Sequence, residues 1–313
     1  MINHSSQAAG IDIGKAALDM ALTSDARRWR FANDDEGREE LVAELRSLGV
    51  VRVGLEASGG YERAVVERLR SAGFDVVLFQ PRQVRAYAAY RLRRAKNDAI
   101  DAGLIAACAA EHGPARGAPD PRLVALAEPL RLLEQTEDDI SRLKTRSETY
   151  RSPEIRAVLA DEIKRLKASR AAQIKRLRSA ITAEPDLARR FELVVSIAGI
   201  GERTALTLLI AMPELGAMSR EQAASLAGLA PFDRDSGKHE GRRTIAGGRT
   251  NVRTALYAAA LPAAFKWNVS LVALYRRLKA RGNPHKKALI ACARKLLIYV
   301  NAVLARATPW QAA

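Results

Sequence analysis

Short apolar or alternating stretches in the first third of the chain predict β-strands, and longer stretches with helical periodicity follow them. The strand patterns lie at 9–13, 17–23, 28–32, 51–55 and 75–79. The helical patterns lie at 36–48, 60–72, 82–93 and 97–111. The first three strands are close together, as in an antiparallel meander, and helices and strands then alternate. This order predicts a mixed sheet with helices on its faces, of which the ribonuclease-H/RuvC type is one example.

The middle of the chain predicts two long amphipathic helices. A break rich in Gly and Pro at 113–121 precedes the first, in which leucines recur at steps of three and four from Leu123 onward. Ser152-Pro153 then interrupts the pattern, and a second helix is expected over about 154–182. The pair predicts an antiparallel helical hairpin or coiled coil, although Arg170 interrupts its apolar stripe. A spacer and a dimerisation element are both open readings of this segment.

The remainder of the chain, 191–306, is expected to be mostly helical around a polar, glycine-rich stretch at 231–251. A loop of that length inside a compact helical domain is usually functional or disordered. The predicted fold class is therefore α/β plus all-α. Its expected domains are 8–115 with a mixed sheet, a helical coiled-coil segment at 120–185 and a helical domain at 190–306.

Composition adds that the chain is globular and increasingly cationic. Hydrophobic residues are 48% of the 313 residues, and the formal net charge is +16. Residues 1–115 carry 16 basic and 16 acidic residues, 116–190 carry 17 and 12, and 191–313 carry 18 and 7. A cationic domain of this kind most often binds a polyanion.

Several protein classes are disfavoured by the same sequence. The apolar stretch 255–265 is too short to span a bilayer and contains Pro262, so no membrane partner is expected. The N-terminus does not resemble a signal peptide. Cys108 and Cys292 lack zinc-ligand spacing and suggest no disulfide framework. A cytoplasmic protein fits these features.

Four carboxylates are the first candidates for chemistry. Asp12 and Glu56 each end an apolar strand pattern, and α/β sheets place their sites at the carboxyl ends of strands. Asp98 and Asp101 are three residues apart and therefore share one helix face. Taken alone, that pair fits a solvated surface better than a site. Together, the four carboxylates predict a site for divalent metal ions, and on a basic protein that favours phosphodiester chemistry on nucleic acid.

Two further segments are candidates for binding phosphates. The helix pattern just before Asp98 contains a run of cations without acidic residues, which fits either a phosphate track or a solvated face. Its expected nucleic-acid contacts are Arg85, Arg91, Arg93, Arg94 and Lys96. Gly199 and Gly201, before a helix start, offer backbone N–H groups as helix-hairpin-helix elements do, but a plain turn between packed helices explains them nearly as well.

The polar stretch 231–251 contains a serine with cationic neighbours. A loop serine beside a glycine is usually no more than that, and Ser236 needs a base or a metal to act as a nucleophile. Lys238, Arg242 and Arg243 lie close to it in sequence and are expected to bind phosphate.

Taken in order, these segments resemble the DEDD transposases of bacterial insertion sequences, the insertion sequence 110/116/902 family, which is related to the pilin-gene invertase. GIDIGKAALDMAL, LEASGGYER and KNDAIDAGLIA are similar to its three acidic blocks. Four later segments are similar to its second domain: SIAGIGERTALTLLIAM, AASLAGLAPFDRDSGK, TIAGGRTNVRTALYAAA and NPHKKALIACARKLL. The resemblance covers nearly the whole chain.

The resemblance implies a RuvC-like first domain in which Asp12, Glu56, Asp98 and Asp101 bind Mg²⁺, or Mn²⁺. It implies that Ser236 is the nucleophile that joins covalently to DNA during strand exchange. It also implies a DNA substrate, a guide RNA encoded by the element in some members, and a nucleoid-associated homo-oligomer, a dimer or a tetramer. Two alternatives are a metal-dependent Holliday-junction-type nuclease that uses water, and a non-catalytic nucleic-acid-binding scaffold.

Overall fold

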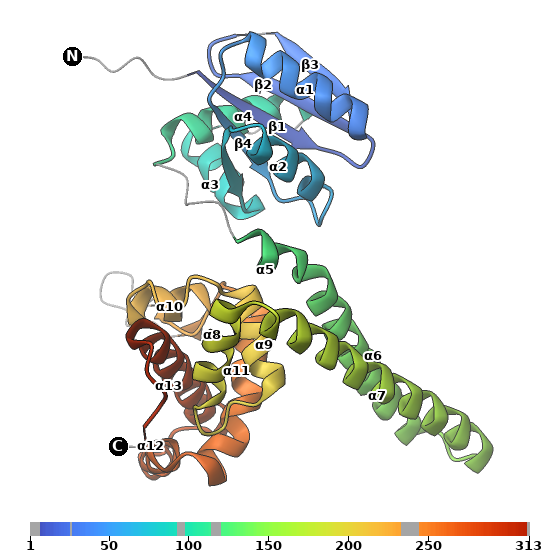
Figure 1. The fold of residues 1–313 in the computed structure, drawn as a ribbon, viewed down its shortest axis with the longest axis vertical. Helices are drawn as coiled ribbons and strands as arrows, with labels where there is room; N and C mark the ends of the chain where they lie inside the picture. The colour runs from blue at the N-terminus through green and yellow to red at the C-terminus, as the bar shows by residue number, and fades with distance from the viewer. Residues whose placement is uncertain (1–6, 26, 93–97, 114–119, 233–243, 312–313) are drawn as a thin grey trace. The chain divides into compact units, whose positions relative to one another are not determined.

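The computed structural model describes the 313-residue chain apart from residues 1–6, 26, 93–97, 114–119, 233–243 and 312–313, and describes only the backbone of 98–100 and 232. The chain forms two compact units, Met1–Ala118 and Pro119–Ala313. The predicted class, a mixed sheet plus a helical part, is confirmed (Figure 1).

The first unit is built on a five-stranded mixed sheet with the strand order β3-β2-β1-β4-β5. The three N-terminal strands pair antiparallel, as the meander prediction requires, while β1–β4 and β4–β5 are parallel. The strands are β1 (Ala8–Ile13), β2 (Ala17–Leu22), β3 (Arg28–Ala32), β4 (Arg52–Glu56) and β5 (Asp75–Phe79). The helices are α1 (Asp35–Ser47), α2 (Glu62–Ser71), α3 (Pro81–Tyr90) and α4 (Asp98–Glu111).

Strand alternation divides this sheet into two different faces. Ala9, Ile11 and Ile13 of β1 join the larger apolar cluster, which the side chains of α1 and α2 complete. Ala8 belongs to a smaller cluster on the opposite face, together with Ile105 of α4. Because side chains alternate along a strand, Gly10 and Asp12 share the face of Ala8. The even-numbered residues of β1 therefore face α4.

In its described residues, the second unit is helical apart from one short strand pair that the sequence pattern did not predict. That pair joins Pro231–Phe232 (β6) to Thr244–Ile245 (β7) within the polar stretch. The first helices are α5 (Pro121–Ala125), α6 (Ala127–Thr149), α7 (Pro153–Thr182), α8 (Pro185–Val195), α9 (Glu202–Ala211) and α10 (Arg220–Leu226). The last are α11 (Thr250–Pro262), the π-helix η1 (Ala263–Trp267), α12 (Val269–Ala280) and α13 (His285–Arg306).

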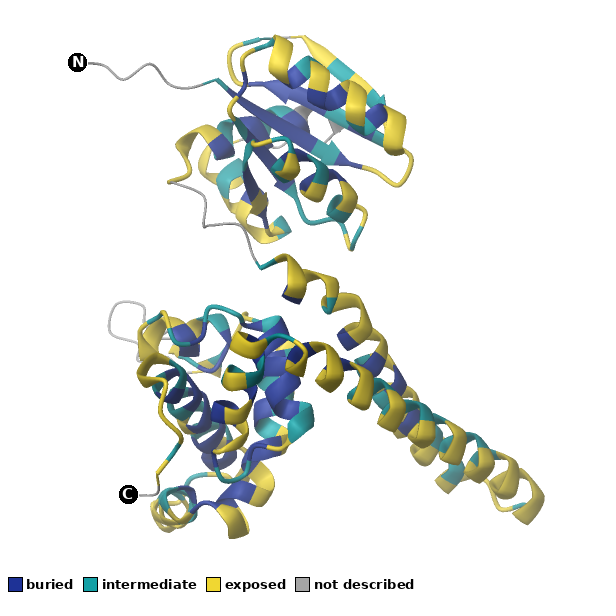
Figure 2. Cartoon of the chain, in the orientation of Figure 1, coloured by how far each residue is buried: buried dark blue, intermediate teal, exposed yellow. Residues whose placement is uncertain are grey.

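The predicted antiparallel hairpin is formed by α6 and α7, and its two ends differ in burial (Figure 2). At the root, Leu133 and Ile181 are fully buried in the core of the second unit. Farther out the helices are largely exposed, and Val158 keeps 69% of its surface. The three-part domain division remains a prediction, but contacts place this hairpin in the second unit because its root residues share that unit's core.

Arg170, which interrupts the apolar stripe, has a structural partner. Its Nε donates to Glu137 Oε1 at 2.8 Å across the hairpin. Glu137 also accepts from Arg203 Nη2 of α9 at 2.7 Å, so one carboxylate joins three helices. Burial alone would raise the pKa of Glu137, but hydrogen bonds from Arg203 and Arg170 lower it overall. The charged residue thus fastens the hairpin to the helical core.

One helix of the described chain, α13, is long and apolar enough to cross a bilayer by length and composition. One side of it, including Leu289, Cys292 and Leu296, is buried in the helical core, as in the core helix of a folded domain. Both cysteines of the chain are free thiols. Burial raises the pKa of Cys292 to about 11, so this thiol stays protonated at neutral pH and its role is packing.

Candidate active site at the edge of the five-stranded sheet

Two glycines let α4 lie directly on the backbone of the sheet. Gly10 of β1 and Gly54 of β4 are register partners. A Cβ on Gly10 would lie 2.2 Å from Ala102 O and Ala106 N, and one on Gly54 would lie 2.7 Å from Ala109 Cβ. No such contacts are tolerated, so only glycine permits this approach. The position of α4 is therefore set by the backbones of β1 and β4.

These contacts also fix the direction of α4. Along β1, Ala8 packs in the cluster that contains Ala109, whereas Gly10 faces Ala102 and Ala106. The helix therefore runs antiparallel to β1, and its N-terminus lies toward the carboxyl ends of β1 and β4. One helical turn rises about 5.4 Å and two strand residues span about 6.6 Å. One turn back along α4 therefore corresponds to about two residues forward along β1 or β4.

The register places each helical aspartate position in line with one strand carboxylate. Asp98 is one turn before Ala102, which faces Gly10, and Asp12 is two residues beyond Gly10. In the neighbouring row, Asp101 is one turn before Ile105. Ile105 faces Gly54, and Glu56 is two residues beyond that glycine. The structure thus brings all four predicted positions to one edge of the sheet.

The far end of α4 is anchored on the same face. Arg52 of β4 donates from Nη1 to the carbonyl oxygen of His112 at 2.7 Å, and from Nε to Asp75 Oδ2 at 2.8 Å. Arg52 is held by a charge pair on the sheet while it binds the C-terminal end of the helix, where a cation complements the helix dipole. This contact restrains the helix that carries the two aspartates.

The chemistry of the four residues fits a hard divalent cation, because all their side-chain donors are carboxylate oxygens. Asp12, Glu56 and Asp101 are each half-buried. Asp12 Oδ1 accepts from the backbone N–H of Ile13 at 3.0 Å. Among the side chains that the structure describes, no three His, Cys, Asp or Glu residues are grouped closely enough to hold a metal ion. The side chain of Asp98 lies outside that description, and the metal site remains a prediction.

A fifth carboxylate, which the sequence reasoning missed, lies beside Asp12. Asp19 of β2 is the register partner of Asp12, so their side chains share the α4 face about 5 Å apart at Cβ. Arg30, the partner of Asp19 on β3, lies 3.6 Å from its carboxylate. Like charges facing each other across a sheet are unfavourable unless compensated. Register alone reveals this Asp12–Asp19–Arg30 row, so periodicity could not have found it.

The loop after Glu56 is organised by a second missed residue, Glu62. Its Oε2 accepts from the backbone N–H groups of Ser58 at 3.1 Å and Gly60 at 2.8 Å. Burial raises the pKa of Glu62, but these hydrogen bonds outweigh it and lower the pKa overall. Gly59 and Gly60 both have positive φ, at 79° and 124°. The acidic block thus contains one carboxylate at the strand end and another that shapes the loop beside it.

The predicted phosphate-binding run is only partly described. Arg85 of α3 is exposed and forms no salt bridge with any residue that the structure describes. Arg91 lies 3.7 Å from Glu111 of α4, so it has a counter-charge that the local sequence did not show. Arg93, Arg94 and Lys96 lie outside the described residues. The contacts of this run with nucleic acid remain predictions.

The two glycines before α9 have different surroundings. Gly199 has a φ of 101°, and a Cβ there would lie 2.3 Å from Ala263 Cβ, so the turn is packed against the start of η1. Gly201 is the N-cap of α9 and has open space where a Cβ would be. Packing therefore accounts for Gly199, whereas the space beside Gly201 is open.

Ser236 lies outside the described residues, as do Lys238, Arg242 and Arg243. The described strands on either side pair antiparallel, with Phe232 opposite Thr244. Phe232 and Thr244, which flank the segment 233–243, are therefore neighbours in the second unit.

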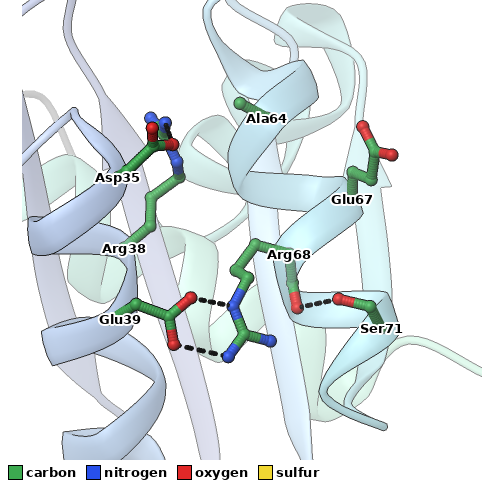
Figure 3. A pocket seen from close by; sticks show the side chains of 7 residues that line it. All are labelled: Asp35, Arg38, Glu39, Ala64, Glu67, Arg68 and Ser71. Carbon is green, nitrogen blue, oxygen red and sulfur yellow. Dashed lines mark hydrogen bonds and ion pairs between the residues drawn. The ribbon is translucent and has the colours of Figure 1, made fainter.

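A surface recess lies between α1 and α2 (Figure 3). It lies on the other face of the sheet, where a bidentate Arg68–Glu39 pair crosses between the helices, with Nη2 2.6 Å from Oε2. That pairing lowers the pKa of Glu39. The remaining lining residues are Asp35, Arg38, Ala64, Glu67 and Ser71. Both of its arginines pair within the recess, Arg68 with Glu39 and Arg38 with Asp35, and we assign it no chemistry.

Comparison with known proteins finds two family matches, one after the other along the chain. A transposase model of the DEDD type matches residues 9–150, and the model described as "Transposase IS116/IS110/IS902 family" matches residues 191–277. Both models describe transposases, and the chain belongs to the IS116/IS110/IS902 family of transposases. It is 27% identical over 312 residues to the pilin gene-inverting proteins of Moraxella bovis and Moraxella lacunata, covering 96% of each chain.

Proposed function

We propose that this protein cuts and exchanges DNA strands for transposition of an insertion sequence, with Ser236 as the nucleophile and the four carboxylates as a metal site. The observation that carries the proposal is the register of α4 on the sheet. In support, the backbone positions of Asp98 and Asp101 on α4 are in line with Asp12 and Glu56, and these four are the acidic positions that the family resemblance implies.

The carboxylates would hold Mg²⁺ or Mn²⁺, which polarises a scissile phosphate and stabilises the charge that develops on it. A RuvC-like fold for the first unit is part of this proposal. The strand order and the antiparallel meander support it. Asp19 and its Arg30 partner keep the charge beside Asp12 in balance, and the loop held by Glu62 positions the backbone next to Glu56.

In the reaction, Ser236 Oγ attacks phosphorus while one phosphorus–oxygen bond to a deoxyribose breaks. The serine proton passes to a base, and the departing sugar oxygen takes up a proton. The phosphoserine bond conserves the energy of the broken bond, so attack by the hydroxyl of a second strand rejoins DNA without ATP. The serine loop and the four carboxylates together distinguish this chemistry from hydrolysis by water.

Exchange of two strands requires at least a dimer, and a tetramer fits best. A guide RNA encoded by the element is the expected source of target specificity, and the strong positive charge of the second unit supports an RNA cargo. The protein would act in the bacterial cytoplasm on nucleoid DNA.

The test is to trap covalent protein–DNA adduct with the wild type, Ser236→Ala and Asp101→Ala. We expect adduct with the wild type in the presence of Mg²⁺ and none with either variant. If Ser236→Ala still forms adduct and recombines DNA, the serine assignment fails. Cleaved ends without covalent protein would instead favour the junction nuclease. Binding without any cleavage would favour the scaffold.

A further inference from the structure

A group of aromatic rings lies on the surface of the second unit. Phe265 of η1 leaves 55% of its surface exposed. Its ring centroid lies 5.0 Å from that of Tyr275 of α12 and 6.2 Å from that of His285 of α13. Tyr275 and His285 are also in contact, with Oη 2.6 Å from Nδ1. We call Phe265, Tyr275 and His285 the aromatic patch.

The patch rests on a rigid support. Asn268, which follows η1, is fully buried and donates from Nδ2 to the carbonyl oxygen of Ala198 at 3.1 Å. Its Oδ1 accepts from the backbone N–H of Leu271 at 3.2 Å and so caps α12. One buried side chain thus fixes both η1 and α12. Short π-helices of this kind occur frequently at functional sites.

The part of the sequence that contains the patch carries only positive charge. Glu240 is the last acidic residue of the chain, and residues 241–313 contain 14 Lys and Arg with no Asp or Glu. Lys266, Arg276 and Lys286 each adjoin one ring in sequence and are exposed. None of these three, nor the neighbouring exposed Lys287, forms a salt bridge with a carboxylate in the described part of the chain. Beside them, Lys266 Nζ lies 5.1 Å from the exposed ring of Trp267.

We infer that the aromatic patch binds unpaired nucleotides, with a base stacked on Phe265 and the flanking phosphates held by Lys266, Lys286 and Lys287. Exposed rings among uncompensated cations are the arrangement by which proteins hold single-stranded nucleic acid. A second copy of this surface does not fit, because two such cationic surfaces repel each other. The inference rests on the proposed function only in taking nucleic acid as the partner.

The experiment measures binding without catalysis. Fluorescence anisotropy of the full-length protein in EDTA would be recorded with labelled oligothymidylate, labelled oligouridylate and a labelled DNA duplex of equal length. The variants are Phe265→Ala and the pair Lys286→Ala with Lys287→Ala. The matched controls are Tyr150→Ala, an exposed ring at the hairpin, and the pair Lys164→Ala with Lys167→Ala on α7.

Phe265→Ala is expected to weaken binding of the single strands about tenfold, within the range for loss of one base–aromatic stack, while duplex affinity changes less than about twofold. The lysine pair should weaken all three probes and lower the salt slope for single strands by about 1.4, two phosphates at about 0.7 each. Neither control should show these effects. The tighter of the two single-stranded probes identifies DNA or RNA as the natural source.

The inference is overturned if Phe265→Ala binds single strands as tightly as the wild type, or loses single strand and duplex equally. It is also overturned if that variant changes the oligomeric mass in sedimentation without changing binding, because the patch would then be a protein interface. A failure of strand exchange leaves this result untouched, since neither the carboxylates nor Ser236 takes part in the assay.

Discussion

The two units of this chain differ in charge far more than in size. Met1–Ala118 carries 17 basic and 16 acidic residues, whereas Pro119–Ala313 carries 34 and 19. The nearly neutral unit gathers carboxylates at a sheet edge, and the cationic unit has unpaired cations around exposed rings. The charge of each unit therefore suits its proposed ligand: clustered carboxylates in a nearly neutral unit suit a metal cation, and an excess of cations suits a polyanion.

Their packing differs in the same sense. In the first unit, Gly10 and Gly54 bring a helix onto the sheet and so position the acidic residues. In the second, two partly exposed ion pairs of Glu137, with Arg170 and Arg203, fasten a long hairpin to a helical core. Close backbone contact sets the first site, while polar side chains tie together the second unit. Substitutions at these places should therefore affect strand cleavage, the stability of the first unit and the attachment of the hairpin independently of one another.

The largest effect is expected when the charge at the sheet edge is removed. Glu56→Gln keeps the shape of the side chain but removes a negative charge and an anionic ligand. Strand cleavage should fall at least about 100-fold, the scale for loss of one electrostatic contribution to the transition state. Affinity for DNA should stay within about twofold. Cleavage rates and anisotropy on the same preparation check this. An equal loss of cleavage and of DNA affinity would contradict the assignment of chemistry and DNA binding to different units.

The next effect concerns folding of the first unit. Gly10→Ala puts a Cβ into the backbone of α4, and overpacking of this kind costs about 3 kcal/mol. Hydrogen exchange under increasing urea should show the loss in peptides of Met1–Ala118 only. Gly113→Ala, where a Cβ meets nothing within 4 Å, is the control and should change stability by less than about 0.5 kcal/mol. Equal destabilisation of both units by Gly10→Ala would contradict the claim that the two units are packed independently.

The smallest effect is expected at the hairpin root. Glu137→Gln weakens the bonds to Arg170 and Arg203 and should lower the second unit's stability by about 1–2 kcal/mol at neutral pH. The pKa of Glu137 is lowered in the folded protein, so its contribution is present above the usual value of 4.5 and is lost as pH falls through the folded pKa. The variant should lose that pH dependence in urea titrations.

Glu134, one turn away on α6, provides the matched comparison. Burial raises its pKa despite a hydrogen bond from Asn251, and its Oε1 is buried without a hydrogen bond. With a raised folded pKa, its favourable contribution is present below the usual value and is lost as pH rises through the folded pKa. Glu134→Gln should therefore stabilise the unit at neutral pH. If both glutamine variants shifted stability in the same direction, this account of the root would be wrong.

Strand and helix positions of the first unit were predictable because alternation and helical periodicity are local properties. The predicted strands end within a residue or two of the observed ones, as at 51–55 against Arg52–Glu56. Register is not local. The pairing of Asp12 with Asp19, and the role of Gly10 under α4, depend on which strands meet. The carboxylate edge was therefore predictable as a set of residues but not as two aligned rows.

In the second unit, the roles of several residues could not be decided from the sequence, because they depend on how the helices pack. Arg170 looked like an interruption of a stripe but pairs with Glu137, which lies 33 positions earlier in the chain. The close contact of Gly199 with Ala263 and the aromatic patch around Phe265 join segments from separate helices. No spacing rule could bring these residues together before the fold was known.

The most direct test of the central claim measures binding and covalent adduct on one DNA substrate, with Mg²⁺ and after chelation with EDTA. If the first unit supplies the metal site and the second holds nucleic acid, chelation should abolish the adduct, leave affinity within about twofold and be reversed by added Mg²⁺. Full adduct formation in EDTA, or loss of binding together with the adduct, would contradict it.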